Sequence, residues 1–322
     1  MGGVLAAPCA RAQKSLKRPV LGSLTPHPAP KQQSDGPILA HLRKLGWVNG
    51  ENIEIFRPDA EGREDRLPAL AEEMVRRRVD VIWAVGPEAA IAAARATQTI
   101  PIVFWGVASP VEQGLVDSYA RPGRNVTGVA FFTGPELSAK LLEILSQVAP
   151  GAKRVAAITT PSSTEPVAGE RRSRAGSPVE SAAQLLGLEF RTHPVRSSDD
   201  LDPAFAAILE SRAQALLTFG TTLTFRERQR IAGFASRHRL PSVFNQREFV
   251  EAGGLVSYGP DTWETVLQSM GYVDRVLRGS RPADLPVERP SKYELVVNLK
   301  TARAIDLKIP QSVLLRADRV IE

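Results

Sequence analysis

The residues that could do chemistry in this chain stand where short apolar runs end. Gly86-Pro87-Glu88 and Gly220-Thr221-Thr222 each follow an apolar run and precede a helical pattern, so each predicts a strand that turns into a helix. Backbone N–H groups at the start of a helix suit a carboxylate or another anion. Hydroxyl, amide and carboxylate side chains follow the other apolar runs, at residues 22–25, 106–110, 159–164 and 245–248. Such a set of polar groups is typical of a small-molecule pocket.

These residues also have a purely structural interpretation, because Gly, Ser, Thr and Pro are favoured in caps and turns whatever a protein does. For the set as a whole, an internal duplication favours a pocket. Strand, glycine, helix, proline-led strand and a Val-Glu phrase follow one another from residue 79 to 116, and again from 213 to 256. This predicts two similar α/β lobes, and ligands of open α/β sheets collect beyond the carboxyl ends of the strands.

No motif for catalysis accompanies these residues. The sequence has no G-x-x-x-x-G-K-[ST] phosphate loop, no G-x-G-x-x-G fingerprint, no G-x-S-x-G elbow and no H-E-x-x-H pair. The four histidines are scattered singly, at positions 27, 41, 193 and 238, and Cys9 is the single cysteine. We therefore expect a protein that is not an enzyme and has no catalytic residue, metal or cofactor. An enzyme that lacks these motifs is the third alternative.

The charge of the chain raises the question of nucleic acid. The formal net charge is +6 and the pI about 9.7, which would suit an acidic partner. The basic residues are spread along the chain, however, and the densest runs, residues 76–78 and 171–174, have no aromatic residues interleaved. Solvated faces explain both runs better, and we expect no nucleic-acid partner.

The elements that position the polar residues alternate between short apolar runs and amphipathic helical patterns, which is typical of an α/β fold with parallel sheets. Strands are expected at residues 20–24, 51–56, 81–85, 100–105, 155–158, 215–219 and 242–244. Helices are expected at 38–45, 67–78, 88–96, 136–148, 225–239 and 263–277. Residues 165–178 predict an irregular loop, because prolines and glycines interrupt a basic stretch there.

The N-terminal residues predict the tail of an export signal. Ala10-Arg11-Ala12 forms the A-x-A pattern of a signal-peptidase site after a short apolar stretch. A basic n-region and a longer apolar core are missing, so we expect a longer signal with cleavage after Ala12. A disordered alanine-rich terminus is the alternative. No other stretch is long and apolar enough to span a bilayer, so the mature protein is expected to be soluble and periplasmic.

Several phrases resemble ABC transporter substrate-binding proteins of the tryptophan/tyrosine-binding type. They are LGWVNGENI at residues 45–53, IPIVF at 100–104, the stretch 115–128 that ends in ARPGRNVTG, REFVEAGGL at 247–255, LVVNLKTA at 295–302 and the tail 310–322. The resemblance covers about residue 18 to the end, and the run 121–128 is its most specific part.

The resemblance implies a type I periplasmic-binding fold, in which two similar parallel-sheet lobes are joined by a three-strand hinge. The crossings would lie near residues 128–133, 253–259 and 285–293. Lobe one would hold residues 18–130 and 255–283 and lobe two residues 131–254 and 284–322, after a signal remnant and linker at 1–17. Gly128 and Gly254 would be hinge positions, because backbone angles must change at a crossing.

In this family the ligand lies between the lobes, which close on it. By the resemblance, Ser23, Thr25, Gly86, Glu88 and Ser109 would line one wall, and Thr160, Thr221 and Glu248 the other. One departure is Ser109-Pro110, where family members often carry Asp-Pro. Since an acidic side chain there would suit a ligand ammonium group, Glu88 or Glu248 would have to substitute.

The leading interpretation is the extracytoplasmic solute-binding component of an ABC importer, with a permease and its ATPase as partners. The helix starts at Glu88 and Thr221 predict a ligand with a carboxylate, and four aromatic residues of the same region predict an apolar or aromatic body: Trp105, Phe131, Phe219 and Phe244. An amino acid or another small carboxylate fits both. The alternative is a sensory or regulatory protein of the same fold, cytoplasmic or periplasmic, although no helix-turn-helix precedes the core.

Overall fold

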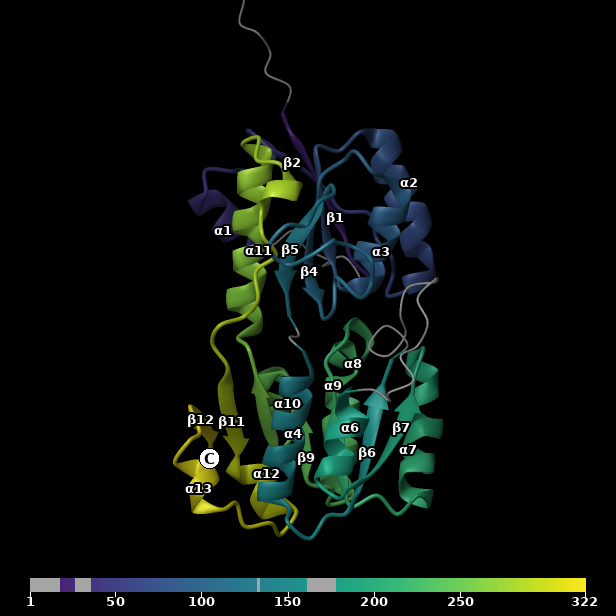
Figure 1. Cartoon of the computed structure of the whole chain (residues 1–322), viewed down its shortest axis with the longest axis vertical. Coiled ribbons are helices and arrows are strands. Elements are labelled where there is room, and N and C mark those ends of the chain that lie inside the picture. Colours follow the sequence, from purple (N-terminus) through teal and green to yellow (C-terminus); the bar gives the residue numbers. More distant parts are fainter. Residues whose placement is uncertain (1–17, 27–35, 132–133, 161–177) are drawn as a thin grey trace, which may run out of the picture.

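The computed structural model describes residues 18–26, 36–131, 134–160 and 178–322. The predicted signal remnant and nearly all of the irregular segment 165–178 lie outside these ranges. Within them the chain forms two sheets, each covered by helices on both faces (Figure 1). We call the first sheet with its helices lobe one, and the second sheet with its helices lobe two.

Lobe one is built on a parallel sheet with the strand order β2-β1-β3-β4-β5. Its strands are β1 (Val20–Leu24), β2 (Glu54–Phe56), β3 (Val81–Val85), β4 (Ile102–Val107) and β5 (Val126–Ala130). The short helix η1 (Glu64–Arg66), α2 (Leu67–Arg77) and α3 (Pro87–Ala96) follow β2 and β3. Leucine, alanine and methionine side chains of α2 and α3 pack on one face of the sheet. The other face is covered by α1 (Pro37–Lys44) and by a helix from late in the sequence, α11 (Thr262–Leu277).

Lobe two is built on a larger sheet with the order β12-β11-β10-β9-β8-β6-β7, parallel except where β10 pairs with β11. Its strands are β6 (Arg154–Thr159), β7 (Glu189–Pro194), β8 (Ala215–Thr218), β9 (Ser242–Phe244), β10 (Val256–Gly259), β11 (Glu294–Asn298) and β12 (Arg319–Ile321). One face carries α4 (Gly134–Val148), α6 (Pro178–Leu185), α12 (Leu299–Ala304) and α13 (Gln311–Leu314). The other carries α7 (Leu201–Glu210), α8 (Thr222–Arg226), α9 (Arg228–Arg237) and α10 (Arg247–Glu251).

The carboxyl ends of the parallel strands of the two sheets point toward each other (Figure 1). The chain passes between the lobes after β5, between β10 and α11, and between α11 and β11. In the last of these connections η3 (Pro282–Asp284) is followed by Glu288, whose backbone hydrogen-bonds to Gly128 and Ala130 of β5. The predicted fold class, α/β with two mostly parallel sheets, is confirmed.

Two predicted boundaries differ from the structure. The sequence placed residues 284–322 in lobe two, but the Leu285 carbonyl accepts from Thr127 Oγ1 and Val287 packs in the core of lobe one. The sequence placed residues 255–283 in lobe one, but β10 (Val256–Gly259) pairs with β9 and β11 inside the sheet of lobe two. The chain enters lobe one only at Asp261, which caps α11. The reason is that the apolar run before α11 completes the second sheet instead of linking the two.

The two glycines predicted as hinges have a packing role in the structure. Gly128 lies inside β5 opposite Phe104, and a Cβ atom there would collide with the backbone of that residue. Gly254 precedes β10 at the amino end of the strand, where a Cβ would lie 2.8 Å from the Phe249 carbonyl oxygen and against the Phe244 ring. Neither glycine lies in a connecting segment, so close approach explains both better than hinge motion does.

Candidate functional site

The wall that lobe one contributes begins at Gly86, between β3 and α3. Gly86 has φ 87°, a backbone angle that favours glycine, and its N–H donates to the Trp105 carbonyl at 2.8 Å. Pro87 starts α3, and Glu88 lies in the first turn of this helix. A Cβ atom at Gly86 would lie 2.8 Å from Thr222 Oγ1 of lobe two. The two lobes therefore meet at the predicted strand-to-helix turn.

The matching turn of lobe two is more tightly closed on itself. Thr221 caps the five-residue helix α8, and its N–H donates to Thr224 Oγ1 at 2.8 Å while Thr221 Oγ1 accepts from the Thr224 N–H at 3.4 Å. Thr222 is buried beside Gly86. Because its side chain and its N–H serve the cap, Thr221 supports the turn, and the surface that meets lobe one is Thr222.

A second contact between the lobes carries charge. Arg226, at the end of α8, donates from Nη1 to the Gly62 carbonyl at 2.8 Å and from Nη2 to Ser198 Oγ at 3.0 Å. Burial raises the pKa of Glu64 to about 7, the charge of Glu88 adds to this, and Arg226 opposes it. Glu64 of lobe one thus lies near a second carboxyl of its own lobe, Glu88, and near Arg226 of lobe two.

Buried polar groups mark the carboxyl ends of β8, β9 and β10. Asn245 and Gln246 directly follow β9 and are 0% and 4% exposed. The Gly220 N–H, after β8, donates to Asn245 Oδ1 at 2.6 Å. Among the described residues, four buried polar atoms on these strands or directly after them have no hydrogen-bond partner: Thr218 Oγ1, Asn245 Nδ2, Gln246 Oε1 and Ser257 Oγ. Such atoms are rare in folded proteins, so a ligand or water partner is expected here.

Glu248 lies where α10 meets the start of α11. Its Oε2 accepts from Thr262 Oγ1 at 3.2 Å, and burial raises its pKa. Next to it, Arg247 Nη1 donates to Asp261 Oδ2 at 2.6 Å and to Glu294 Oε1 at 3.2 Å. These contacts tie α10 to the segment that connects β10 with α11 and to the start of β11, so Glu248 lies beside a connection between the lobes.

The other predicted wall residues all lie at carboxyl ends of strands. Ser23 is in β1 opposite Trp83, and Thr25 follows β1; both are buried. Thr160 follows β6 and is also buried. Ser109 is half-buried after β4, and its carbonyl accepts from the Gln113 N–H at 3.0 Å. Their role in binding stays a prediction.

Sequence reasoning did not single out Glu64 or Arg226, which come together only through the fold. Nor did it choose Asn245 and Gln246, although both stand in the polar range 245–248 that follows a predicted strand. The signal that could have found them is their position directly after an apolar run. Their burial as amides could not be read from that position.

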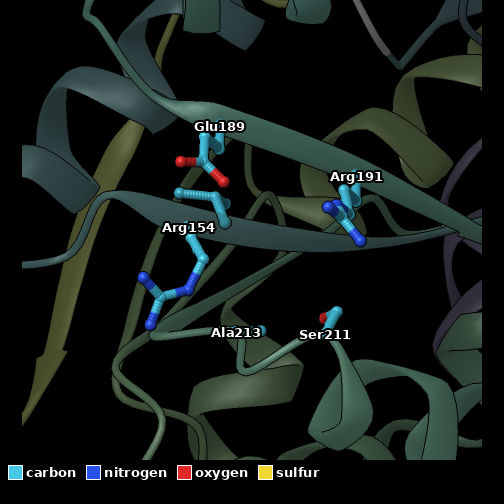
Figure 2. A pocket seen from close by; sticks show the side chains of 6 residues that line it. Arg154, Glu189, Arg191, Ser211 and Ala213 are labelled. Carbon is cyan, nitrogen blue, oxygen red and sulfur yellow. The ribbon is translucent and has the colours of Figure 1, made fainter.

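A small pocket lies at the opposite end of lobe two (Figure 2). It is lined at the amino ends of β6 and β7 by Arg154, Val155, Glu189 and Arg191, and before β8 by Ser211 and Ala213. Its volume is about 180 Å³ including space open to solvent, whereas ligand pockets usually span roughly 300–1,000 Å³. The pocket is smaller than a usual ligand pocket and lies away from the facing strand ends, so it is not a candidate for the ligand site.

The part of the chain that the structure describes contains no cluster of three or more His, Cys, Asp or Glu side chains that could hold a metal ion. None of its helices combines the length and the apolar character that crossing a membrane requires.

Known proteins share this architecture. The chain is 25% identical over 295 residues to a tyrosine-binding protein of Clostridioides difficile strain R20291, covering 92% of this chain and 82% of that protein. A conserved domain protein of Vibrio cholerae has a similar structure, with a TM-score of 0.81, 24% identity and coverage of 94% and 99%. An ABC domain from Streptococcus pneumonia solved in complex with L-Trp gives a TM-score of 0.78, 22% identity and coverage of 94% and 100%.

These likenesses show the type I periplasmic-binding fold that the sequence predicted. The family model described as ABC transporter substrate binding protein matches residues 22–321, which is nearly the whole chain. The chain therefore belongs to the family of ABC transporter substrate-binding proteins.

Proposed function

We propose that this protein captures an amino acid with an aromatic side chain between its two lobes and delivers it to an ABC importer. The observation that carries the proposal is the meeting of the two strand-to-helix turns, Gly86 of lobe one against Thr222 of lobe two. In open α/β sheets this is the end at which ligands bind. The names of the similar proteins, one tyrosine-binding and one solved with L-Trp, support the aromatic class.

Within this proposal, Glu88 is the acidic group for the ligand ammonium. The two candidates that could replace the missing aspartate at Ser109 differ in position: Glu248 contacts Thr262, beside the segment that connects β10 to α11. Glu88 lies at the point where the lobes touch, with one carboxylate oxygen 3.3 Å from the Cβ position of Gly86. Ser23, Thr25, Ser109 and Thr160 would complete the surroundings of the ligand.

The proposal also includes export, a periplasmic location, and a membrane permease with its ATPase as partners. Family membership and the A-x-A pattern at Ala10-Arg11-Ala12 support it. Mass spectrometry of the periplasmic fraction should find a chain that begins at Gln13. A cytoplasmic chain that keeps Met1 would contradict the location.

The ligand class is tested by a thermal-shift screen of amino acids, aromatic carboxylates, sugars and nucleosides. Tryptophan, tyrosine or phenylalanine at a hundredfold excess over its Kd should add about 2.7 kcal/mol of stability. For a chain of this size the shift in Tm is about 4 °C. A Tm that rises with sugars or nucleosides, and with no amino acid, would rule the proposal out.

The choice of test residue follows from the structure. A Thr221→Pro change, which the sequence alone suggests, would break the cap of α8, because the Thr221 N–H donates to Thr224. Glu88→Gln is cleaner, since it keeps the size of the side chain and removes its charge. We expect this variant to lower the affinity for aromatic amino acids at least tenfold. Glu72→Gln, on the exposed face of α2, is the control.

A further inference from the structure

The two amides that follow β9, Asn245 and Gln246, are buried and held in place by their neighbours. Asn245 Oδ1 accepts from the Gly220 N–H at 2.6 Å. Because a backbone N–H needs an acceptor, this bond fixes which end of the amide faces Gly220. Nδ2 therefore points away from Gly220, and it is buried without a hydrogen-bond partner among the described residues.

Close packing leaves the pair no freedom to turn toward solvent. The Asn245 backbone carbonyl lies against Gly259, at the end of β10, where no Cβ would fit. The side chain of Gln246 lies equally close to Gly220, at the end of β8, and its Oε1 is buried without a partner in the same part of the structure. Asn245 and Gln246 can occupy these positions because Gly259 and Gly220 have no side chains. A donor and an acceptor are held ready at the end of the sheet that faces lobe one.

We propose that Asn245 and Gln246 recognise the head group of an α-amino acid, Nδ2 donating to its carboxylate and Oε1 accepting from its ammonium. This rests on the proposed function and assigns the residues of lobe two that read the ligand. A zwitterionic head group offers an acceptor and a donor on one carbon atom, which matches a donor and an acceptor on consecutive residues. Neutral amides meet it without burying a further unpaired charge.

The decisive variant is Asn245→Asp. It keeps the size of the side chain and the oxygen that binds the Gly220 N–H, and it replaces the Nδ2 donor by an anionic oxygen. The affinity for L-amino acids, measured by calorimetry, should fall at least tenfold, because a hydrogen bond is lost and a repulsion is gained. Ser242→Ala is the control, since Ser242 is a buried polar residue at the amino end of the same strand. It should leave the affinity unchanged.

A pair of ligands separates recognition from a loss of packing. The wild type should bind the methyl ester of the amino acid at least tenfold more weakly than the free acid, because the ester lacks the anionic oxygen. In Asn245→Asp this preference should vanish or reverse. An equal preference for the free acid in both proteins would overturn the proposal, since the carboxylate would then be bound elsewhere.

The remaining outcomes are also decisive. If the wild type binds a non-aromatic amino acid and Asn245→Asp does not bind it, head-group recognition stands and the proposed aromatic ligand class is wrong. If the wild type binds no α-amino acid, both proposals are wrong. Should circular dichroism show that Asn245→Asp does not fold, Gln246→Met decides with analogues that lack the amino group. Removing the amino group from the ligand should lower its affinity for the wild type far more than its affinity for the variant. An equal loss of affinity in both proteins would refute recognition of the ammonium by Gln246.

Discussion

The duplicated unit of the sequence becomes β3-α3-β4 in lobe one and β8-α8-α9-β9 in lobe two, and the two copies treat their polar groups differently. In lobe one, the indole N–H groups of Trp47, Trp83 and Trp105 donate to side chains of α11, at 2.8, 3.0 and 3.0 Å. In lobe two, Thr218 and Ser257 flank β9 with buried hydroxyl oxygens that have no partner in the described residues.

The difference shows that similar topology does not give the lobes equal tasks. Lobe one satisfies the indole groups of Trp47, Trp83 and Trp105 internally, through α11. Lobe two keeps polar atoms desolvated at the facing end of its sheet, which costs stability unless something else pairs with them. In the function proposed above both lobes contact the ligand, Glu88 from lobe one and the two amides after β9 from lobe two.

The largest effect is expected from filling the space of one packing glycine in each lobe. Gly128→Val should lower the free energy of unfolding by at least about 3 kcal/mol, because the new side chain meets the Phe104 backbone, which cannot move aside. Gly254→Val should cost less, since part of its clash is with the Phe244 ring. Urea unfolding measures both, with Gly151→Ala in open space as the control. Equal losses would contradict the ranking.

A smaller effect, dependent on pH, is expected from the charged contact between the lobes. The pKa of Glu64 is raised from 4.5 to about 7, so the folded state favours the protonated form. The contribution of Glu64 to stability is therefore fully present below pH 4.5 and is lost as the pH rises through about 7, by at most about 3 kcal/mol. Glu64→Gln should remove this fall from thermal melts at a series of pH values. A fall of the same size in the variant would assign it to other groups.

The smallest effect compares the same substitution in both lobes. Thr265→Val leaves the Trp105 N–H without its acceptor and should cost about 1–2 kcal/mol. Thr218→Val removes a buried hydroxyl oxygen that has no partner among the described residues, so it should be nearly neutral or stabilising. Chemical denaturation of the two variants compares them directly. If Thr218→Val costs as much as Thr265→Val, the contrast between the lobes is wrong.

Most of the fold could be predicted because buried parallel strands and amphipathic helices leave strong patterns. The expected strands did not include β7, β11 or β12, and β5 and β10 were expected only as crossings between the lobes. For β7 the reason is that it is an edge strand with mostly exposed residues such as Glu189 and Thr192. The single helix expected at 225–239 is two helices, α8 and α9, and begins earlier, because Thr221 caps it. Apolar spacing reveals a helix face and says nothing about where a cap divides it.

The candidate site was harder to predict. Polar residues after apolar runs marked the facing strand ends, and that signal found Gly86 and the residues around Thr222. It could not find the contact of Arg226 with the Gly62 carbonyl, because these residues are 164 positions apart and neither follows a strand. Nor could it show that the Thr221 N–H donates to Thr224. It could not show either that Asn245 Nδ2 is buried without a partner among the described residues, since both facts depend on side-chain geometry.

The late position of α11 in the sequence also governs how the protein is made. A ribosome delivers β1 to β5 long before residues 262–277, so the nascent first sheet has one face without the helix that pairs with Trp47, Trp83 and Trp105. Five of the seven strands of the second sheet, β6 to β10, are synthesised in the meantime. Domains usually mature in the order of translation, but here lobe one is completed only after most of the strands of lobe two have been made.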